Sequence, residues 1–487
     1  MRWILLLTLA LPMFGCHRHF DDDDDFSSVW PSDFDRNGYA DILVGAPLDD
    51  AGVAASDRGR VYLYSGAPGL DAIADVMYDG AEDASQFGFS TAALGDYNGD
   101  GAADFAVGAP FDDADGNATD NLLNRGRVFI YFGGSSSYPG TTPSITLSGA
   151  QNDGHFGSSV ARAGDVNGDG KDDLIVGAPD ENAGGTLRGA AYLFTNASTT
   201  PLLSFSGGED SSQYGLSVTT AGDMNGDGYF DLAIGAPGDD DDGNTANNAI
   251  EKGRVYLYFG SASPDNSVDK VFAGVENGGQ FGFSLAGLLD FNTDGYGDLA
   301  IGAPFDDGDG NTVEDGGDLG RAFVFFGAFS VDTSADRTMT GTESGARFGG
   351  LVARIGDVNA GGAPDLIVSA PRDDGDGNAT DSGADRGRAF IYFGGPSSDT
   401  IADLTLTGGE DGGHFGASAF SGGDVDGDGI RDVVVGAPED DGDGNAAENG
   451  LDVGRVFLFR GGSGIDNIVD LTITGAEVDA LLGTSVQ

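Results

Sequence analysis

The chain has few of the residues that most often carry catalysis or crosslinks. Its 487 residues include one cysteine and four histidines, so no internal disulfide can form. His155 and His414 occupy one equivalent position in a repeat, and His17 and His19 lie near the N-terminus. No histidine can be placed convincingly in a Ser-His-Asp type of triad. Only 23 residues are basic and 80 are acidic, and the resulting charge of −57 excludes nucleic acid as an expected partner.

Long apolar runs and helical periodicity are also scarce. The apolar run at residues 3–14 is too short to cross a bilayer and has the length of the core of an export signal. After this run no segment shows the 3.6-residue periodicity of an amphipathic helix. The apolar content of 39%, with 31 phenylalanines, is nevertheless sufficient for a packed core.

The N-terminal segment indicates export. Arg2 precedes the apolar run and Gly15-Cys16 follows it, which resembles a bacterial lipoprotein signal that is cut before a lipid-carrying cysteine. The alternative is a plain secretory signal with an incidental cysteine. We predict a signal peptide at 1–15, a lipidated Cys16 with an acidic tether at 16–31, and a folded part at 32–487. The predicted location is the bacterial outer membrane or cell surface, or otherwise the medium.

A nine-residue acidic segment recurs seven times. Its starts are separated by 63, 69, 58, 67, 67 and 67 residues, and the copies lie at 33–41, 96–104, 165–173, 223–231, 290–298, 357–365 and 424–432. An aromatic-Gly pair stands nine residues before six of the copies. After each copy come an apolar run ending in Ala-Pro, a polar loop and two more strand-like runs. Each unit therefore predicts four short β-strands.

Seven such units predict an all-β, seven-bladed β-propeller. The first unit lacks the aromatic-Gly pair, and the equivalent pair, Leu482-Gly483, lies at the other end of the chain. We therefore expect a C-terminal strand to complete the first blade and close the ring, which removes an open sheet edge.

The order FG, D-x-[DN]-x-D-G-x-x-D and GAP resembles the FG-GAP repeat. The pattern is similar to the seven-bladed head of integrin α subunits, and to repeats in bacterial surface proteins and in a secreted phospholipase D. The resemblance implies a calcium-binding propeller. It also implies that catalysis in the phospholipase relatives belongs to a separate domain, so we expect this chain not to be an enzyme.

The acidic segments have the chemistry of calcium loops. Positions 1, 3, 5 and 9 supply hard oxygen donors, position 7 supplies a carbonyl, and Gly at position 6 permits the sharp turn. The alternative is a set of Asx turns between strands. The predicted ligands are Asp33, Asp35, Asn37, Asp41, Asp96, Asn98, Asp100, Asp104, Asp165, Asn167, Asp169, Asp173, Asp223, Asn225, Asp227, Asp231, Asp290, Asn292, Asp294, Asp298, Asp424, Asp426, Asp428 and Asp432.

Two of the loops depart from the pattern. The loop at Asp357 has Gly361 at position 5 and Pro364 near its end, so we expect it to bind calcium weakly or not at all. The loop at Asp33 has Asn37 at position 5 and Arg36 beside it, which should lower its affinity. The expected number of Ca²⁺ ions is about six.

Long polar loops after Ala-Pro carry a second acidic series. The simpler interpretation is a solvated charged loop fixed by a following arginine such as Arg388. The alternative is a second set of calcium sites. The candidate ligands are Asp307, Asp309, Asn311, Asp374, Asp376, Asn378, Asp381, Asp441, Asp443 and Asn445.

The expected function is non-catalytic binding or adhesion at the cell surface. Successive turns of a four-stranded blade alternate between faces, so the long loops should share one face with the links between blades. Binding usually resides in such loops, and we expect a protein or glycan ligand there, held by cationic groups or by calcium bridges. A lectin-like or a structural surface protein is the alternative. We expect contact with the membrane only through lipid.

Replacing the only cysteine tests the predicted anchor. Cys16→Ala should release the protein from membranes, because a thiol is needed to carry the lipid. Membrane fractions washed in high salt and probed by immunoblot measure the release. A variant that stays in these fractions would contradict the prediction.

Overall fold

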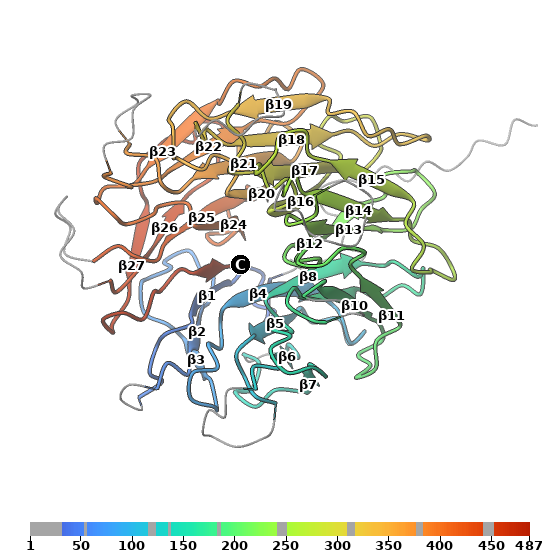
Figure 1. Cartoon of the computed structure of the whole chain (residues 1–487). Helices are drawn as coiled ribbons and strands as arrows, with labels where there is room; N and C mark the ends of the chain where they lie inside the picture. Colours follow the sequence, from blue (N-terminus) through green and yellow to red (C-terminus); the bar gives the residue numbers. More distant parts are fainter. Residues whose placement is uncertain are drawn as a thin grey trace, which may run out of the picture.

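The computed structural model describes residues 32–52, 56–114, 123–134, 138–182, 187–240, 251–308, 317–375, 383–441 and 452–487. Their regular structure consists of β-strands in seven four-stranded antiparallel sheets arranged as blades around a centre (Figure 1). Within these residues no helix has the length and apolar character needed to cross a membrane. The predicted seven-bladed propeller is confirmed.

The strands of each blade run outward from the centre in the following order. Blade 1 contains β28 (Ser485–Val486), β1 (Ile42–Ala46), β2 (Arg60–Tyr64) and β3 (Val76–Asp79); blade 2 contains β4 (Ser90–Gly95), β5 (Asp104–Ala109), β6 (Arg127–Tyr131) and β7 (Ile145–Ser148); blade 3 contains β8 (Ser159–Gly164), β9 (Asp173–Ala178), β10 (Ala190–Phe194) and β11 (Leu203–Ser206); blade 4 contains β12 (Val218–Gly222), β13 (Asp231–Ala236), β14 (Arg254–Tyr258) and β15 (Lys270–Ala273); blade 5 contains β16 (Ser284–Leu289), β17 (Asp298–Ala303), β18 (Arg321–Phe325) and β19 (Arg337–Thr340); blade 6 contains β20 (Leu351–Gly356), β21 (Asp365–Ala370), β22 (Arg388–Tyr392) and β23 (Leu404–Thr407); blade 7 contains β24 (Ser418–Gly423), β25 (Asp432–Ala437), β26 (Arg455–Phe459) and β27 (Leu471–Thr474).

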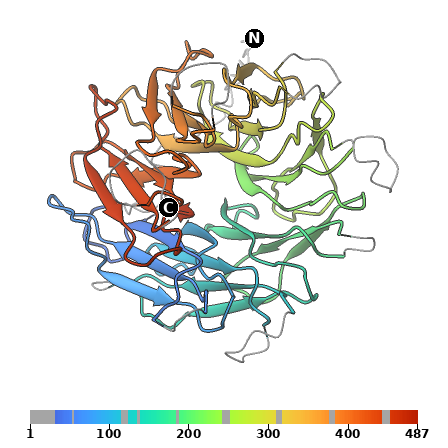
Figure 2. The same ribbon diagram turned by 60° about the vertical axis from the view of Figure 1, so that its left-hand side comes forward.

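The C-terminal strand closes the ring. β28 pairs antiparallel with β1 so that Val486 lies opposite Val44. Beyond this pair, the backbones of Leu43 and Gln487 exchange hydrogen bonds of 2.8 and 3.0 Å. The chain therefore ends near the centre, against the first blade (Figure 2). The closure predicted from Leu482-Gly483 is confirmed.

The apolar core is divided among the boundaries between blades. Seven clusters of buried residues occur, and each combines side chains of two neighbouring blades. The second strand of every blade is buried along its whole length, because a neighbouring blade covers each of its faces. This explains why these segments are continuous apolar runs in the sequence and do not alternate.

The FG and GAP motifs meet at these boundaries. In blade 2 a Cβ placed on Gly108 would lie 2.1 Å from the carbonyl oxygen of Gly157, which belongs to the link leading into blade 3. The Ser90 hydroxyl donates a 2.8 Å hydrogen bond to the same carbonyl. Five other boundaries repeat the serine bond. The glycines of both motifs are therefore required by close backbone approach.

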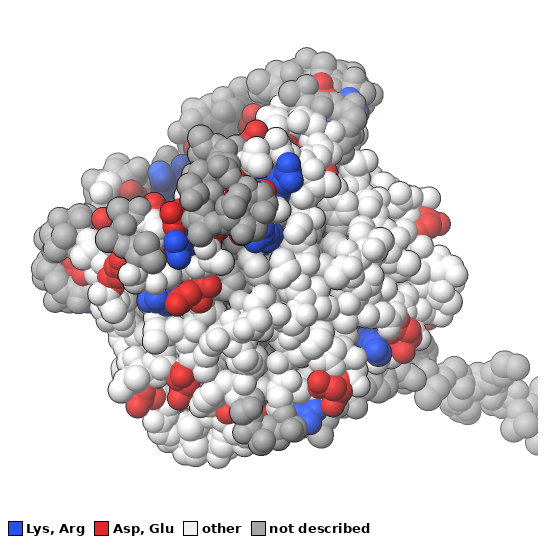
Figure 3. All heavy atoms as spheres, turned by 90° about the horizontal axis from the view of Figure 1, so that it is seen from below, with Lys and Arg blue, Asp and Glu red and all other residues white. Residues whose placement is uncertain are grey.

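The two faces of the ring carry different connections. Nine-residue loops join the first and second strands, and they contact the loops between the third and fourth strands, as in the 2.8 Å bond from Gly133 N–H to Asp104. Long loops contact the links between blades on the other face, as in the 2.9 Å bond from Asp113 N–H to Glu82. Seen from the side, charged side chains gather toward the margins, with a largely uncharged band between them (Figure 3).

Removing the closing strand should destabilise the ring. Deletion of residues 485–487 exposes the edge of β1 and removes Val486, which is 5% exposed, together with the backbone bonds to Leu43. We expect the free energy of unfolding to fall by roughly 3–5 kcal/mol, from lost apolar burial and hydrogen bonds. Denaturant titration followed by circular dichroism measures this change. Val478→Ala, which truncates an exposed side chain of the same C-terminal segment, is the control. Equal stability of the deletion and the control would contradict the closure.

Candidate metal centres

The nine-residue loops begin at an irregularity in the first strand. In blade 2 the register of β4 against β5 shifts between Ala93 and Gly95, and Gly95 has a φ of +63°. Blades 3 to 7 have the same shift. A left-handed φ favours glycine, which explains the Gly that precedes Asp in most copies. The bulge turns the chain out of the strand and into the loop.

The Asp at position 1 holds the loop in a turn. Oδ1 of Asp165 accepts a 2.9 Å hydrogen bond from the N–H of Asp169, and Oδ2 accepts one of 2.8 Å from Gly170. The equivalent carboxylate bonds N–H groups of positions 4 to 6 in the other six loops, those of Asp33, Asp96, Asp223, Asp290, Asp357 and Asp424. The Asx-turn interpretation is therefore correct as a description of the backbone. It does not exclude a cation, because a carboxylate has about four lone-pair sites.

The Asp at position 9 is buried beneath the loop. Asp231 accepts hydrogen bonds of 2.9 Å from Gly260 N–H, in the loop after β14, and from Met224 N–H, at position 2. It thereby joins the two loops of one face within a blade. Burial raises the pKa of this carboxyl group in most blades: to about 8 in Asp41 and Asp173, and to about 7 in Asp104 and Asp432.

The raised pKa values determine the pH dependence of the metal-free protein. A carboxyl group with a folded-state pKa above its usual value binds protons more tightly in the folded state. The stability it contributes is therefore present at low pH and is lost as pH rises through the folded-state pKa, here between about 4 and 8. A cation bound to the loop would remove this penalty, because it favours the ionised form.

Two loops bring three carboxylates together. Asp33, Asp35 and Asp41 each place an oxygen within 4.8 Å of the others, and Asp424, Asp426 and Asp432 do the same in blade 7. Oxygens bound to one Ca²⁺ at 2.3–2.6 Å cannot be more than about 5 Å apart. Positions 1, 3 and 9 of these loops therefore fit the ion.

In loops with Asn at position 3, the asparagine side chain donates a hydrogen bond to another predicted ligand of the same loop. Asn98 donates a 3.0 Å bond to Asp100, and Asn292 donates one of 2.9 Å to Asp294. In blade 3, Oδ1 of the buried Asp173 has no hydrogen-bond partner among the described residues. A cation would satisfy such an oxygen. Calcium binding at these loops stays a prediction.

The loops at Asp33 and Asp357, which differ from the sequence pattern, have the same backbone turn as the others. Asp357 bonds the N–H groups of Gly361 and Gly362 at 2.8 and 2.7 Å, so the turn forms without a carboxylate at position 5. Arg36 does not bond its own loop, because it donates a 2.9 Å bond to the carbonyl of Asp100 in the next blade. The sequence pattern gave no sign of this contact.

The second acidic series lies only partly within the described residues. Asp307, Asp374 and Asp441 are buried at the start of their long loops. Asp309, Asn311, Asp376, Asn378, Asp381, Asp443 and Asn445 lie outside the described residues. The preceding Asp pairs with the arginine that begins the third strand, as Asp306 does with Arg321 at 2.9 Å. The arginine thus pairs with the start of the loop, but the aspartates there are buried and not solvated.

The sequence interpretation missed a glutamate on this face. It stands five residues before the aromatic-Gly position in six of the seven links, as Glu276 does before Phe281. In three blades it joins two aspartates in one buried group: Glu209 with Asp239 and Asp240, Glu276 with Asp306 and Asp307, and Glu410 with Asp440 and Asp441. Its fixed spacing in the repeat is the signal that could have revealed it.

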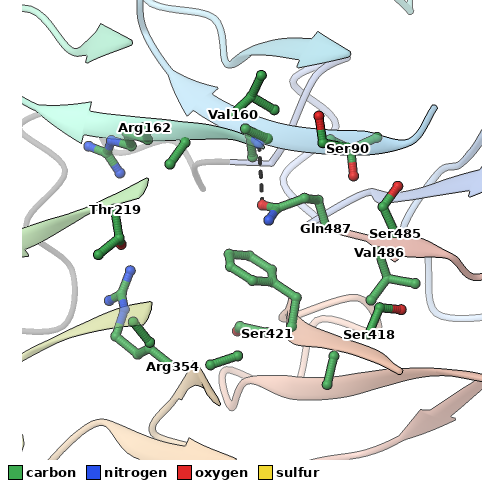
Figure 4. Close-up of a pocket in the computed structure, with 18 of the residues that line it drawn as sticks. Ser90, Val160, Arg162, Thr219, Arg354, Ser418, Ser421, Ser485, Val486 and Gln487 are labelled. Carbon is green, nitrogen blue, oxygen red and sulfur yellow. Dashed lines mark hydrogen bonds between the residues drawn. The ribbon is translucent and has the colours of Figure 1, made fainter. Parts of the chain in front are cut away.

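The centre of the ring encloses a cavity of about 800 Å³. Arg162, Thr219 and Arg354 extend toward it from three blades (Figure 4). Gln487 accepts a 3.3 Å bond there from the N–H of Ala93. The described lining contains no carboxylate side chain, histidine or cysteine.

The family model of the FG-GAP repeat matches residues 27–64, 87–131, 156–194, 214–258, 281–325 and 415–459, more than half of the chain. The chain belongs to the FG-GAP repeat family. The sixth blade is not matched, and it is the blade with Gly361 at position 5 and with Ser369 in place of the glycine of GAP.

Similar proteins contain this ring as one part. Integrin alpha-5 of Xenopus laevis is 35% identical over 45% of this chain and 20% of its own length. Integrin alpha-PS2 of Drosophila melanogaster is 33% identical over 45% of this chain and 15% of its own. The phosphatidylinositol-glycan-specific phospholipase D of Bos taurus is 28% identical over 77% of this chain and 46% of its own. The chain thus spans less than half the length of each.

Among solved structures, that of BBS1N in complex with ARL6DN covers 80% of this chain and 90% of its own at 9% identity, with a TM-score of 0.37. This likeness is too distant to carry an argument.

Removing calcium should destabilise the protein. At about 1 mM Ca²⁺, sites with dissociation constants of about 0.1–1 mM would each add about 0.4–1.4 kcal/mol. Excess chelator should therefore lower the melting temperature measured by calorimetry, and the chelated protein should melt at lower temperature at pH 8 than at pH 5. Asp169→Ala should reduce the effect of calcium. Asp357→Ala removes two hydrogen bonds of its turn but should leave the effect of calcium unchanged. A melting curve that chelator leaves unchanged would contradict the prediction.

Proposed function

We propose that the protein is a non-catalytic binding module stabilised by calcium. The observation that carries this proposal is that the two faces of the closed ring carry different kinds of loop. On one face the loops are short and of fixed length, and their aspartate carboxylates accept hydrogen bonds from N–H groups of the same loop. On the other face, loops of varying length start from a rigid scaffold, which is the usual arrangement of a binding surface.

The proposed ligand-binding surface is the long-loop face, defined by the long loops that follow the second strands and by the links between blades. The links carry half-buried acidic side chains such as Asp83, Asp210 and Asp411, each paired with an arginine at 2.5–2.7 Å. The ligand we propose is an extracellular protein, held by basic groups or through calcium. Similarity to integrin alpha chains supports adhesion, and a glycan ligand is the alternative.

We propose no catalytic role for this chain. The similar phospholipase D names an activity of that whole protein, of which this chain matches 46%. The two described histidines pair with nearby acids, His155 with Asp180 at 2.6 Å and His414 with Glu439 at 3.0 Å. Both pairs fix the links and belong to the repeat, which accounts for them without chemistry. We further propose that the protein is exported and held at the cell surface by lipid on Cys16.

Acidic residues on the two faces provide a matched test. Asp309→Asn, Asp376→Asn and Asp443→Asn together remove three charges from the long loops of blades 5, 6 and 7. Asp332→Asn, Asp399→Asn and Asp466→Asn remove three exposed charges from the opposite face of the same blades, and Asn can still accept the local N–H bond.

Binding would be screened on panels of extracellular proteins and of glycans, with and without calcium. The first variant should lose at least tenfold in affinity for the ligand found, and the control variant should bind normally. If only the control variant loses affinity, the ligand binds the face of the nine-residue loops, and the proposed surface is wrong. Signals only on the glycan panel would favour the lectin-like alternative.

A further inference from the structure

The long-loop face buries groups of three carboxylates. In blade 5, Glu276 is 1% exposed, Asp306 is 3% exposed and Asp307 is 5% exposed. The guanidinium of Arg321 lies 2.9 Å from Asp306. Ionising a buried carboxyl group costs several kcal/mol unless a positive charge compensates it. A cation bound among the three carboxylates would lower that cost.

One glutamate oxygen in each group has no hydrogen-bond partner among the described residues. Oε1 of Glu276 accepts a 2.8 Å bond from the N–H of Asp307, whereas Oε2 is buried and is the oxygen without such a partner. In blade 7, Glu410 Oε1 accepts a 2.9 Å bond from Asp441 N–H, and Oε2 is the unpartnered oxygen within the described part of the chain. In blade 4, Glu209 Oε2 accepts a 3.2 Å bond from Asp240 N–H, and Oε1 is the corresponding oxygen.

The oxygens of each group converge. One oxygen from each of the three carboxylates lies within 4.8 Å of the other two in blades 4, 5 and 7. This is the spacing that a hard divalent cation requires of its oxygen ligands. The second aspartate and the glutamate come from different segments, the long loop and the link, so a cation there would join both.

We propose that Glu209–Asp239–Asp240, Glu276–Asp306–Asp307 and Glu410–Asp440–Asp441 are three divalent-cation sites, with Ca²⁺ as the ion, on the face opposite the nine-residue loops. We name them the link sites. Their ligands are all hard oxygens, which suit Ca²⁺ rather than a transition metal. They share no residue with the nine-residue loops, so either set can bind calcium without the other.

Blades 3 and 6 have different side chains or contacts at the positions of the link sites. Blade 3 has Gln151, Glu181 and Asn182 at the equivalent positions, and Asn182 N–H still bonds Gln151 Oε1 at 3.2 Å. In blade 6, Arg388 pairs with Asp373 and also lies 3.8 Å from Glu343 Oε2. Glu343 Oε2 still has no hydrogen-bond partner among the described residues, and the guanidinium supplies part of the positive charge there. The backbone accepts a neutral side chain at the glutamate position, so Glu→Gln variants should fold.

The test counts bound calcium. The triple variant Glu209→Gln, Glu276→Gln and Glu410→Gln should bind three fewer Ca²⁺ per chain than the wild type, measured by equilibrium dialysis of the full chain at about 1 mM Ca²⁺. The control variant Asp332→Asn, Asp399→Asn and Asp466→Asn loses the same charge from the other face and should bind as the wild type does. Unchanged stoichiometry in a folded triple variant would overturn the proposal, and the groups would then hold protons.

A spectroscopic arm locates one of the sites. The hydroxyl group of Tyr256 donates a 2.7 Å bond to Asp239 in blade 4, so it should transfer excitation to Tb³⁺ bound in that site. Tyr256→Phe should lower tyrosine-excited Tb³⁺ emission in the wild type but not in the Glu209→Gln background. An equal decrease in both backgrounds would mean that the ion seen by Tyr256 is elsewhere, and would overturn the assignment of this site.

Discussion

The structure depends on the close approach of two backbones at each boundary between blades. The glycine of GAP lies so near the FG carbonyl of the next blade that no side chain fits, and a serine hydroxyl bonds that carbonyl. This contact fixes the position of one blade against the next and so determines where every loop emerges. Blade 6 departs here, with Ser369 for the glycine and Leu351 for the serine, and Ser369 Oγ has no hydrogen-bond partner among the described residues. The same blade has Gly361 at position 5 of its acidic loop, so it departs from the repeat at three positions.

The acidic composition is largely a consequence of how the turns are made. Position 1 of each loop uses both carboxylate oxygens to accept backbone N–H bonds, and position 9 does so from beneath, as Asp165 and Asp231 show. The arginines that begin the third strands are committed to the first Asp of the long loops. Few basic residues are left to balance the remaining buried acids. Cations are the natural counter-charge on both faces, because burial penalises an uncompensated charge far more than solvent exposure does.

The sequence was sufficient to predict the architecture because the repeat records it seven times. Spacing predicted the blades, and Leu482-Gly483 predicted the closure, since a missing strand at one end and an extra one at the other have a single consistent explanation. The acidic loops could be recognised because each lies within nine residues, whereas calcium binding there stays a prediction. The Glu276 group could not be recognised, because Glu276 and Asp307 are 31 residues apart and only the folded link brings them together. Contacts between neighbouring loops, such as Lys171 Nζ donating to the carbonyl of Asn98 at 3.2 Å, were hidden for the same reason.

The same geometry gives the acidic groups of the long-loop face a role in closure. In six of the seven blades a glutamate comes from the link that leads into the blade, and two acidic residues come from the loop after its second strand. In blade 1 these segments are the two ends of the chain. Burial, together with the neighbouring Asp49 and Asp50, raises the pKa of Glu477 to about 7. The C-terminal segment therefore brings a carboxylate against two N-terminal ones while β28 pairs with β1. A positive charge shared by the three would draw the ends together, whereas their repulsion opposes the hydrogen bonds of β28. In blade 1 the acidic contact that other blades make within themselves therefore lies across the closure of the ring.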